Sequence, residues 1–297
     1  MAEEHKFLDS GVLNRLMHLV LMARSPMEGT VSGLHKSPHR GSSVEFAEYR
    51  NYVPGDDIRR LDWRVFARTD RFFLKEYEAE TNLRCYFVLD CSGSMKFGNR
   101  FEYAKRLLAT MAYIAAHQGD AAGLICATGK SFLEIPPRRN PAHLKLIFET
   151  LEKTEARGET DLAAVLHDVA EKVRRRAVVM VISDFFCELA PLLNAFQHLR
   201  FQKHDLAVFQ LLDRAELDFR FDRPVRFVDL ESSTSLVTEP STVRDEYLRQ
   251  LWLFLDALRG GCHEFGADYR RVVTDQSYER VLADFLVERA QLAASSP

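Results

Sequence analysis

From about residue 84 to the C-terminus, short apolar runs alternate with stretches of helical periodicity. The runs at 84–89, 121–127, 177–183 and 206–212 are apolar at nearly every position rather than at every second one. Such runs are typical of parallel strands that are buried on both faces and connected by helices. The pattern therefore predicts an α/β fold with a doubly wound, mostly parallel sheet. Residues 131–135 are expected to pair with 121–127 as a hairpin.

The same pattern of hydrophobic positions predicts the remaining helices and strands. Helices are expected at 101–117, 141–151, 161–176, 187–201, 242–264 and 278–288. Further strands are expected at 225–230, 235–238 and 268–273.

The first 80 residues differ from the rest of the chain in composition and in the pattern of apolar positions. Residues 8–24 carry apolar side chains at helical spacing and predict one amphipathic helix that docks on the protein's own body. Residues 25–70 are rich in Gly, Ser, His, Pro and charges, and 72–80 alternate like a strand. We therefore expect a helix and an irregular segment over 1–80, an α/β domain over 81–290 and a disordered tail over 291–297.

Composition excludes several classes of protein. The 297 residues include 40 basic and 43 acidic side chains, a balance that argues against a general nucleic-acid binder. No apolar run reaches the length of a membrane span, and the acidic start does not resemble a signal peptide. The five cysteines are scattered and form no metal-binding spacing. These features predict a cytoplasmic protein with reduced thiols.

Oxygen-bearing side chains gather where strands are expected to end. Asp90, Ser92 and Ser94 follow the run 84–89, Asp184 follows 177–183, and Thr160 precedes a helix. Open α/β sheets bind ligands beyond the carboxyl ends of their strands. Two carboxylates with hydroxyls are hard ligands that suit Mg²⁺ or Mn²⁺ and leave coordination positions for an incoming carboxylate.

These five residues resemble the metal-ion-dependent adhesion site of von Willebrand factor A domains. A second resemblance lies upstream, in the segments 40–50 (RGSSVEFAEYR), 54–59 (PGDDIR), 61–63 (LDW) and 67–70 (ARTD). This series is similar to the signature of the domain-of-unknown-function 58 family, which joins such a segment to a von Willebrand A-like domain. The resemblance covers about residues 10–290.

The resemblance implies a function as well as a fold. Members of that family typically accompany MoxR-type AAA+ ATPases in bacteria, so it implies a non-enzymatic adaptor that docks a partner carboxylate on Mg²⁺, with Mn²⁺ or Ca²⁺ as alternatives. One departure is Glu159, because relatives commonly have Gly-Gly-Thr-Asp where this chain has Gly-Glu-Thr-Asp. Asp161 is left open as either a ligand or an acid in the first turn of a helix.

Other interpretations of the same residues stay open. Asp90, Ser92 and Ser94 could simply cap a helix, and the site could serve a metal-dependent hydrolase or lie empty in a structural scaffold. The arginines between 59 and 71 alternate with aspartates and favour an internal ion-pair lattice, and Arg174, Arg175 and Arg176 favour a solvated helix end. The identity of the client and the oligomeric state cannot be read from the sequence.

Overall fold

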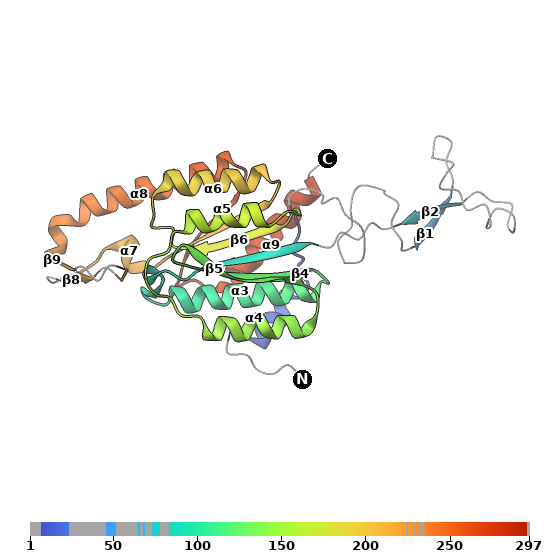
Figure 1. Ribbon diagram of the computed structural model, residues 1–297, viewed down its shortest axis with the longest axis horizontal. Coiled ribbons are helices and arrows are strands. Elements are labelled where there is room, and N and C mark those ends of the chain that lie inside the picture. Colours follow the sequence, from blue (N-terminus) through green and yellow to red (C-terminus); the bar gives the residue numbers. More distant parts are fainter. Residues whose placement is uncertain are drawn as a thin grey trace. The chain divides into compact units, whose positions relative to one another are not determined.

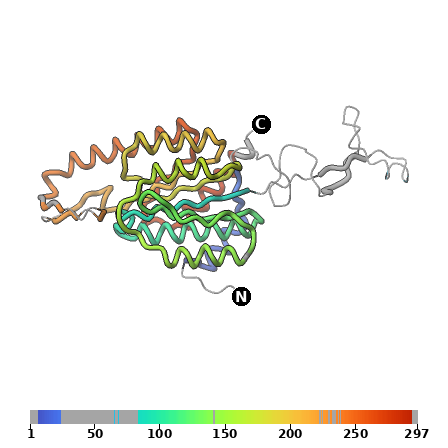
Figure 2. The backbone as a smooth tube through the Cα atoms, viewed as in Figure 1, coloured from blue at the N-terminus to red at the C-terminus, as the bar shows by residue number. Residues whose placement is uncertain are grey.

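The computed structural model describes residues 7–23, 46–51, 65, 68, 73–77 and 83–295, except 222, 224, 229 and 232–234 (Figures 1 and 2). The chain forms two compact units. One comprises Met1–Arg24 with Arg84–Pro297, and the other comprises Ser25–Leu83.

A six-stranded sheet is the centre of the larger unit. Its strands are β3 (Arg84–Asp90), β4 (Ala121–Thr128), β5 (Ser131–Arg138), β6 (Val178–Ser183), β7 (Asp205–Leu212) and β10 (Asp268–Val273). They lie in the order β10-β7-β6-β3-β4-β5, all parallel except β5, which is antiparallel to β4. Every residue of β6 and β7 is buried. The predicted doubly wound, mostly parallel sheet and its hairpin are confirmed.

Helices cover both faces of this sheet (Figure 1). Helices α3 (Arg100–His117) and α4 (Pro141–Lys153) lie on one face. Helices α5 (Leu162–Lys172) and α6 (Leu189–Phe201) lie on the other, where they pack on β3, β6 and β7 in the hydrophobic core. Helix α8 (Pro240–Glu264) packs against α6, and α9 (Tyr278–Ser295) packs against α3.

The helix predicted over 161–176 is too long. Helix α5 ends at Lys172, and Val173 has φ −83° and ψ 85°, outside the helical range. Val173 and Ala177 are both buried, so the chain must turn back toward β6 within a few residues. Arg174, Arg175 and Arg176 therefore lie in a connection and not at a helix end.

The helix predicted over 8–24 is also too long. Helix α1 covers only Ser10–Leu16, and Asp9 caps it by accepting from the backbone N–H of Gly11 at 2.8 Å. The chain turns after the helix, where the N–H of Leu19 donates to the carbonyl of Leu16 at 2.9 Å, and Leu21 is fully buried. The side-chain amide of Gln118 donates to the carbonyl of Leu19 at 2.7 Å and accepts from the N–H of Leu21 at 3.1 Å. Because Gln118 satisfies the backbone of Leu19 and Leu21, the segment docks on the domain without being helical.

The smaller unit contains an antiparallel pair of strands, β1 (Phe46–Asn51) and β2 (Phe73–Tyr77). Strand β2 falls within the alternating run 72–80, as predicted. Strand β1 was not predicted, because its sequence FAEYRN mixes charges with apolar residues. The arginine–aspartate segment 59–71 lies outside the described residues apart from 65 and 68, so the predicted ion-pair lattice stays a prediction.

An extension follows β7. It contains α7 (Arg214–Asp218), the antiparallel strands β8 (Val225–Val228) and β9 (Ser235–Thr238), and the first turns of α8 (Figures 1 and 2). Phe219 stacks on Phe227 of β8 and on Tyr247 of α8, with ring centroids 5.6 and 4.4 Å apart. Aromatic packing therefore ties these elements together. Within the described parts of the chain, no helix is both long and apolar enough to cross a membrane.

Candidate metal site

The site lies where the strand order of the sheet reverses. If the strands β3, β4, β5, β6, β7 and β10 are numbered 1 to 6 along the chain, they lie in the sheet in the order 3-2-1-4-5-6. The order therefore reverses between the first and the fourth strand, which are β3 and β6. In open α/β sheets the loops on either side of this point diverge and leave a crevice at the carboxyl ends of the strands. Asp90 ends β3 and Asp184 follows β6, which places both carboxylates at this crevice.

Asp90 is only 4% exposed and accepts two hydrogen bonds. Its Oδ1 accepts from the backbone N–H of Ser92 at 2.9 Å, and its Oδ2 accepts from the hydroxyl of Ser183 at 2.6 Å. No basic side chain among the described residues pairs with it. Burial, followed by the nearby charge of Asp184, raises the pKa of Asp90 to about 7. Asp90 is thus a buried carboxylate without a positive partner in the described part of the chain.

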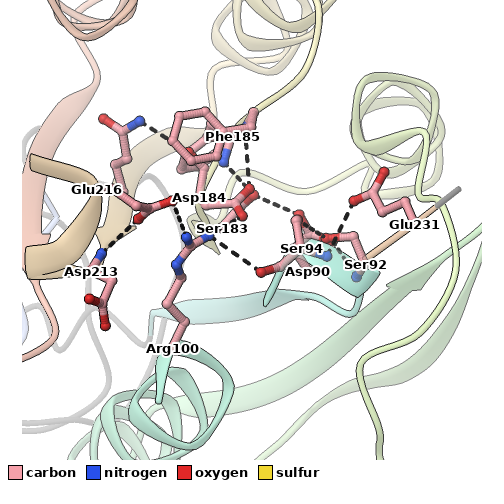
Figure 3. A network of polar contacts seen from close by, with 12 residues as sticks. Asp90, Ser92, Ser94, Arg100, Ser183, Asp184, Phe185, Asp213, Glu216 and Glu231 are labelled. Carbon is pink, nitrogen blue, oxygen red and sulfur yellow. Dashed lines mark hydrogen bonds and ion pairs between the residues drawn. The ribbon is translucent and has the colours of Figure 1, made fainter. Parts of the chain in front are cut away.

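Ser92 and Ser94 lie on the loop that follows β3. Their hydroxyl oxygens are 3.0 Å apart (Figure 3). The short 3₁₀ helix η2 (Gly93–Lys96) begins after Ser92, but the Ser92 side chain makes no capping hydrogen bond to it. Capping of a helix therefore does not explain these hydroxyls.

The loop carrying Thr160 is held against the Asp90 loop by backbone hydrogen bonds. The N–H of Gly93 donates to the carbonyl of Gly158 at 2.7 Å, and the N–H of Arg157 donates to the carbonyl of Cys91 at 2.8 Å. Gly158 has φ +67°, a conformation that favours glycine. The Oγ1 atom of Thr160 is buried, and it has no hydrogen-bond partner among the described residues.

The role left open for Asp161 is settled in part by α5. Asp161 occupies the N-cap position, and its side chain accepts from the backbone N–H of Ala164 at 3.0 Å. It is therefore the cap of the helix rather than a residue of its first turn.

Asp184 is held from two sides. Its Oδ1 accepts from the N–H of Phe186 at 3.2 Å, and its Oδ2 pairs with the guanidinium of Arg100. The next residue, Phe185, has φ +60°, a strained conformation for a bulky side chain. Its N–H donates to the Ser183 hydroxyl at 2.8 Å, and its ring is buried against Phe196. These contacts stabilise the turn that presents Asp184.

Arg100 was not predicted from the sequence as a residue of the site. This residue begins α3, is 2% exposed and bridges Asp184 and Glu216, as Figure 3 shows. A cation at a helix N-terminus opposes the helix dipole, so the position is explained by the two carboxylates and not by the helix. Glu216 also accepts from the N–H of Asp213 at 2.8 Å, which fixes it on α7. Nothing in the spacing could signal a pair that is 84 residues apart in the chain.

All five residues predicted from the sequence line one cavity of about 470 Å³. Its described lining contains five acidic side chains and one basic side chain, Lys130. The acidic ones are Asp90, Glu159, Asp161, Asp184 and Glu231. The structure therefore brings the predicted residues together, and their role as metal ligands stays a prediction.

The donor set fits a hard divalent cation. Within the described part of the chain, the buried Oγ1 of Thr160 has no hydrogen-bond partner and the buried Asp90 has no counter-ion, and one cation would satisfy both. Among the described residues no three His, Cys, Asp or Glu side chains form a metal cluster. Beyond Asp90 and Asp184, the remaining ligands would be hydroxyls and water, as Mg²⁺ sites commonly allow.

Similarity to solved structures is weak. BatB from Bacteroides thetaiotaomicron is 14% identical with a TM-score of 0.46, covering 71% of this chain and all of that one. The VWA domain of SpRpn10 is 10% identical with a TM-score of 0.42, covering 73% of this chain and all of that one. At these scores the assignment of the fold rests on the strand order.

Similarity in sequence is stronger. An uncharacterized protein of Mycobacterium tuberculosis is 28% identical over 245 residues, covering 79% of this chain and 76% of that protein. The uncharacterized protein YeaD of Bacillus subtilis is 31% identical over 119 residues, covering 40% of this chain and 28% of YeaD. Residues 48–252 match the family described as protein of unknown function DUF58. Because this match covers more than half of the residues, the chain belongs to the DUF58 family.

Proposed function

We propose that this protein is a metal-dependent protein-binding module whose cation docks a carboxylate of a partner. Asp90, Ser92, Ser94, Thr160 and Asp184 would hold Mg²⁺, or Mn²⁺ or Ca²⁺ in its place. The observation that carries the proposal is the buried Oγ1 of Thr160, which has no hydrogen-bond partner among the residues that the structure describes and lies in the cavity lined by Asp90 and Asp184.

Charge supports a cation as the first occupant. Asp184 and Glu216 share the single positive charge of Arg100, and Asp90 has no basic partner among the described residues. Acidic side chains outnumber basic ones in the described lining of the cavity, which favours the binding of a divalent cation. A partner's carboxylate would be repelled by the bare cavity, so docking of an acidic partner requires the cation.

The surroundings favour binding over catalysis. Among the described residues that line the cavity there is no histidine, the side chain that most often serves as a general base. Both serine hydroxyls contact one another instead of a base. The bound cation would supply an electrophilic docking point, and the chain's own groups would orient it.

We further propose that the partner is a MoxR-type AAA+ ATPase, with this protein as its adaptor. This step is supported only by the family resemblance described above, and it is the part of the proposal that a binding experiment must establish.

Calorimetric titration of the chelator-treated full-length protein with MgCl₂ and MnCl₂ tests the metal site. We expect saturable binding that Asp90→Ala and Thr160→Val abolish or weaken at least tenfold. Asp168→Asn is the matched control, because Asp168 is an exposed aspartate on α5 that does not line the cavity. Binding that is equally strong in Asp90→Ala would overturn the metal site.

Pull-down of a MoxR-type AAA+ ATPase from the same organism tests the partner. We expect capture in MgCl₂ that is lost in EDTA and in Asp90→Ala, and retained in Asp168→Asn. Equal capture by wild type and Asp90→Ala, with and without EDTA, would refute metal-dependent docking.

A further inference from the structure

The two ends of the central sheet differ in charge. The cavity at the carboxyl ends of the parallel strands is lined by more acidic than basic side chains. At their amino ends, exposed basic side chains gather, and none of them forms an ion pair in the described part of the chain. These residues, called the basic end below, are Arg138, Arg139, Arg174, Arg175 and Lys203.

Strand pairing brings the basic end together. Strand β5 runs antiparallel to the others, so its last residue, Arg138, lies opposite Ala122 near the start of β4. The connections 173–177 and 202–204 lead into β6 and β7, whose first residues lie side by side in the parallel register. The basic side chains of both connections therefore lie at the same end of the sheet as Arg138.

Acidic side chains near the basic end leave most of its charge uncompensated. Asp205 and Asp268 begin β7 and β10, and both pair with Arg289. The two connections themselves contain no acidic residue. Glu171, in the last turn of α5, is the exposed acid closest to them in the chain. This end is therefore positive, although the whole chain carries a net charge of −3.

An exposed aromatic ring accompanies these charges. Phe201 is the last residue of α6 and is 81% exposed, the largest fraction for any large apolar side chain that the structure describes. The chain then turns sharply into β7. Lys203 has φ +65°, which residues other than glycine rarely adopt, and Nη1 of Arg200 donates to the carbonyl of His204 at 2.9 Å. The turn presents Phe201 and Lys203 to the solvent together.

We propose that the basic end and Phe201 bind the surface of a bilayer that contains anionic phospholipids. The lipid phosphates neutralise the basic side chains, and the ring of Phe201 enters the boundary between headgroups and acyl chains. A nucleic acid would attract the same charges. The bilayer is favoured because it also removes the apolar ring from water, and because a broad surface can contact all three parts of the basic end at once. This binding does not require the metal ion proposed above.

Co-sedimentation of the full-length protein with lipid vesicles tests the charges. We expect binding to vesicles of equal parts phosphatidylglycerol and phosphatidylcholine, none to phosphatidylcholine alone, and weaker binding as NaCl is added. EDTA is present throughout, so that no divalent cation bridges protein and lipid. Each basic residue near an anionic surface contributes about fivefold to the affinity, so Arg174→Gln/Arg175→Gln/Lys203→Gln should bind at least roughly tenfold more weakly.

Two further variants separate the position of the charges and the role of the ring. Arg220→Gln/Arg223→Gln/Arg226→Gln is the matched control, because it removes the same three charges from exposed positions of the extension; it should bind as wild type does. Phe201→Ser keeps every charge and should bind the mixed vesicles roughly tenfold more weakly.

The outcomes decide between a lipid surface and the alternatives. Absence of wild-type binding to the mixed vesicles would overturn the proposal. Equal weakening in the two triple variants would also overturn it, because net charge alone would then explain the binding. Wild-type affinity in Phe201→Ser, with equally tight binding of a short DNA duplex, would assign the basic end to a nucleic acid instead.

Discussion

Arg100 and Asp184 form an ion pair between side chains that are 2% and 3% exposed. The ring of Phe97 lies 5.1 Å, and the ring of Phe186 5.7 Å, from the guanidinium carbon, so water is largely excluded around the pair. Arg100 also holds Glu216, which joins α7 to the site. The same residue thus fixes a candidate metal ligand and anchors the extension.

Replacing this arginine should strongly destabilise the protein. Arg100→Met keeps the length of the side chain but leaves Asp184 and Glu216 without a cation, and losing one partner of a buried pair costs about 3–5 kcal/mol. We expect the free energy of unfolding, measured by urea titration in EDTA, to fall by that amount. The double variant Arg100→Met/Asp184→Asn should recover part of it, since the uncompensated charge is removed. A loss below about 1 kcal/mol in the single variant would show that the pair is not buried as described.

Arg289 provides a comparison at the opposite, amino ends of the strands. It is 1% exposed, pairs with Asp205 at the start of β7, and donates from Nε to the carbonyl of Met22 at 2.8 Å. Arg289→Met should lower the free energy of unfolding by a similar amount, about 3–5 kcal/mol. Its affinity for Mg²⁺, measured by calorimetry on the folded variant, should equal that of wild type. If Arg100→Met and Arg289→Met both bound Mg²⁺ more weakly than wild type by the same factor, the global stability of the protein, and not the geometry of the site, would control the affinity.

Two adjacent glycines of α8 should respond in opposite ways to alanine. A Cβ atom at Gly260 meets nothing within 4 Å, so Gly260→Ala should raise the free energy of unfolding by about 0.5–1 kcal/mol through helix propensity. A Cβ atom at Gly261 would lie 2.4 Å from Cδ2 of Leu193 on α6. Overpacking of this kind costs about 1–3 kcal/mol, so Gly261→Ala should be the less stable variant by that margin. Urea titration of both variants measures the difference, and equal stabilities would contradict the packing of α8 on α6.

The sheet and most of the site could be predicted because the information is local. Strands such as 178–183 are buried on both faces and are therefore apolar at nearly every position, and the parallel arrangement brings Asp90 and Asp184 to the same edge. The limits of α1 and α5 could not be predicted in this way. They depend on Gln118 satisfying the backbone of Leu19 and Leu21 and on Val173 being buried, which are contacts made by the folded chain.

The missed residues of the site depend on long-range geometry. Arg100 meets Asp184 and Glu216 only after α3, β6 and α7 have assembled, and Glu231 reaches the cavity only through the path of the extension. Ser183 gave a weak local signal, because it is a hydroxyl immediately before the acid that ends an apolar run. Its hydrogen bond to Asp90 still required the pairing of β3 with β6.

His204 should make the stability of the protein depend on pH. The side chain is fully buried before β7, and its Nδ1 accepts from the backbone N–H of Ala177 at 3.2 Å, so the neutral ring fits the site and a protonated ring does not. Burial lowers the pKa of His204 to about 4 from its ordinary value of 6.5. Between these values the unfolded chain binds a proton that the folded chain does not, so stability falls as the pH falls through this window. From pH 7.5 to pH 5 the loss from this residue should be about 2 kcal/mol.

The variant His204→Asn isolates this contribution, because its Oδ1 can accept the same hydrogen bond and does not titrate. Other groups, among them Asp90 and Glu216, also change protonation with pH, so the quantity to compare is the difference in the free energy of unfolding between wild type and variant. Urea titrations at pH 7.5 and pH 5 should show that wild type loses about 2 kcal/mol more than His204→Asn. Equal losses in the two proteins would mean that His204 takes up its proton in the folded state as readily as in the unfolded one.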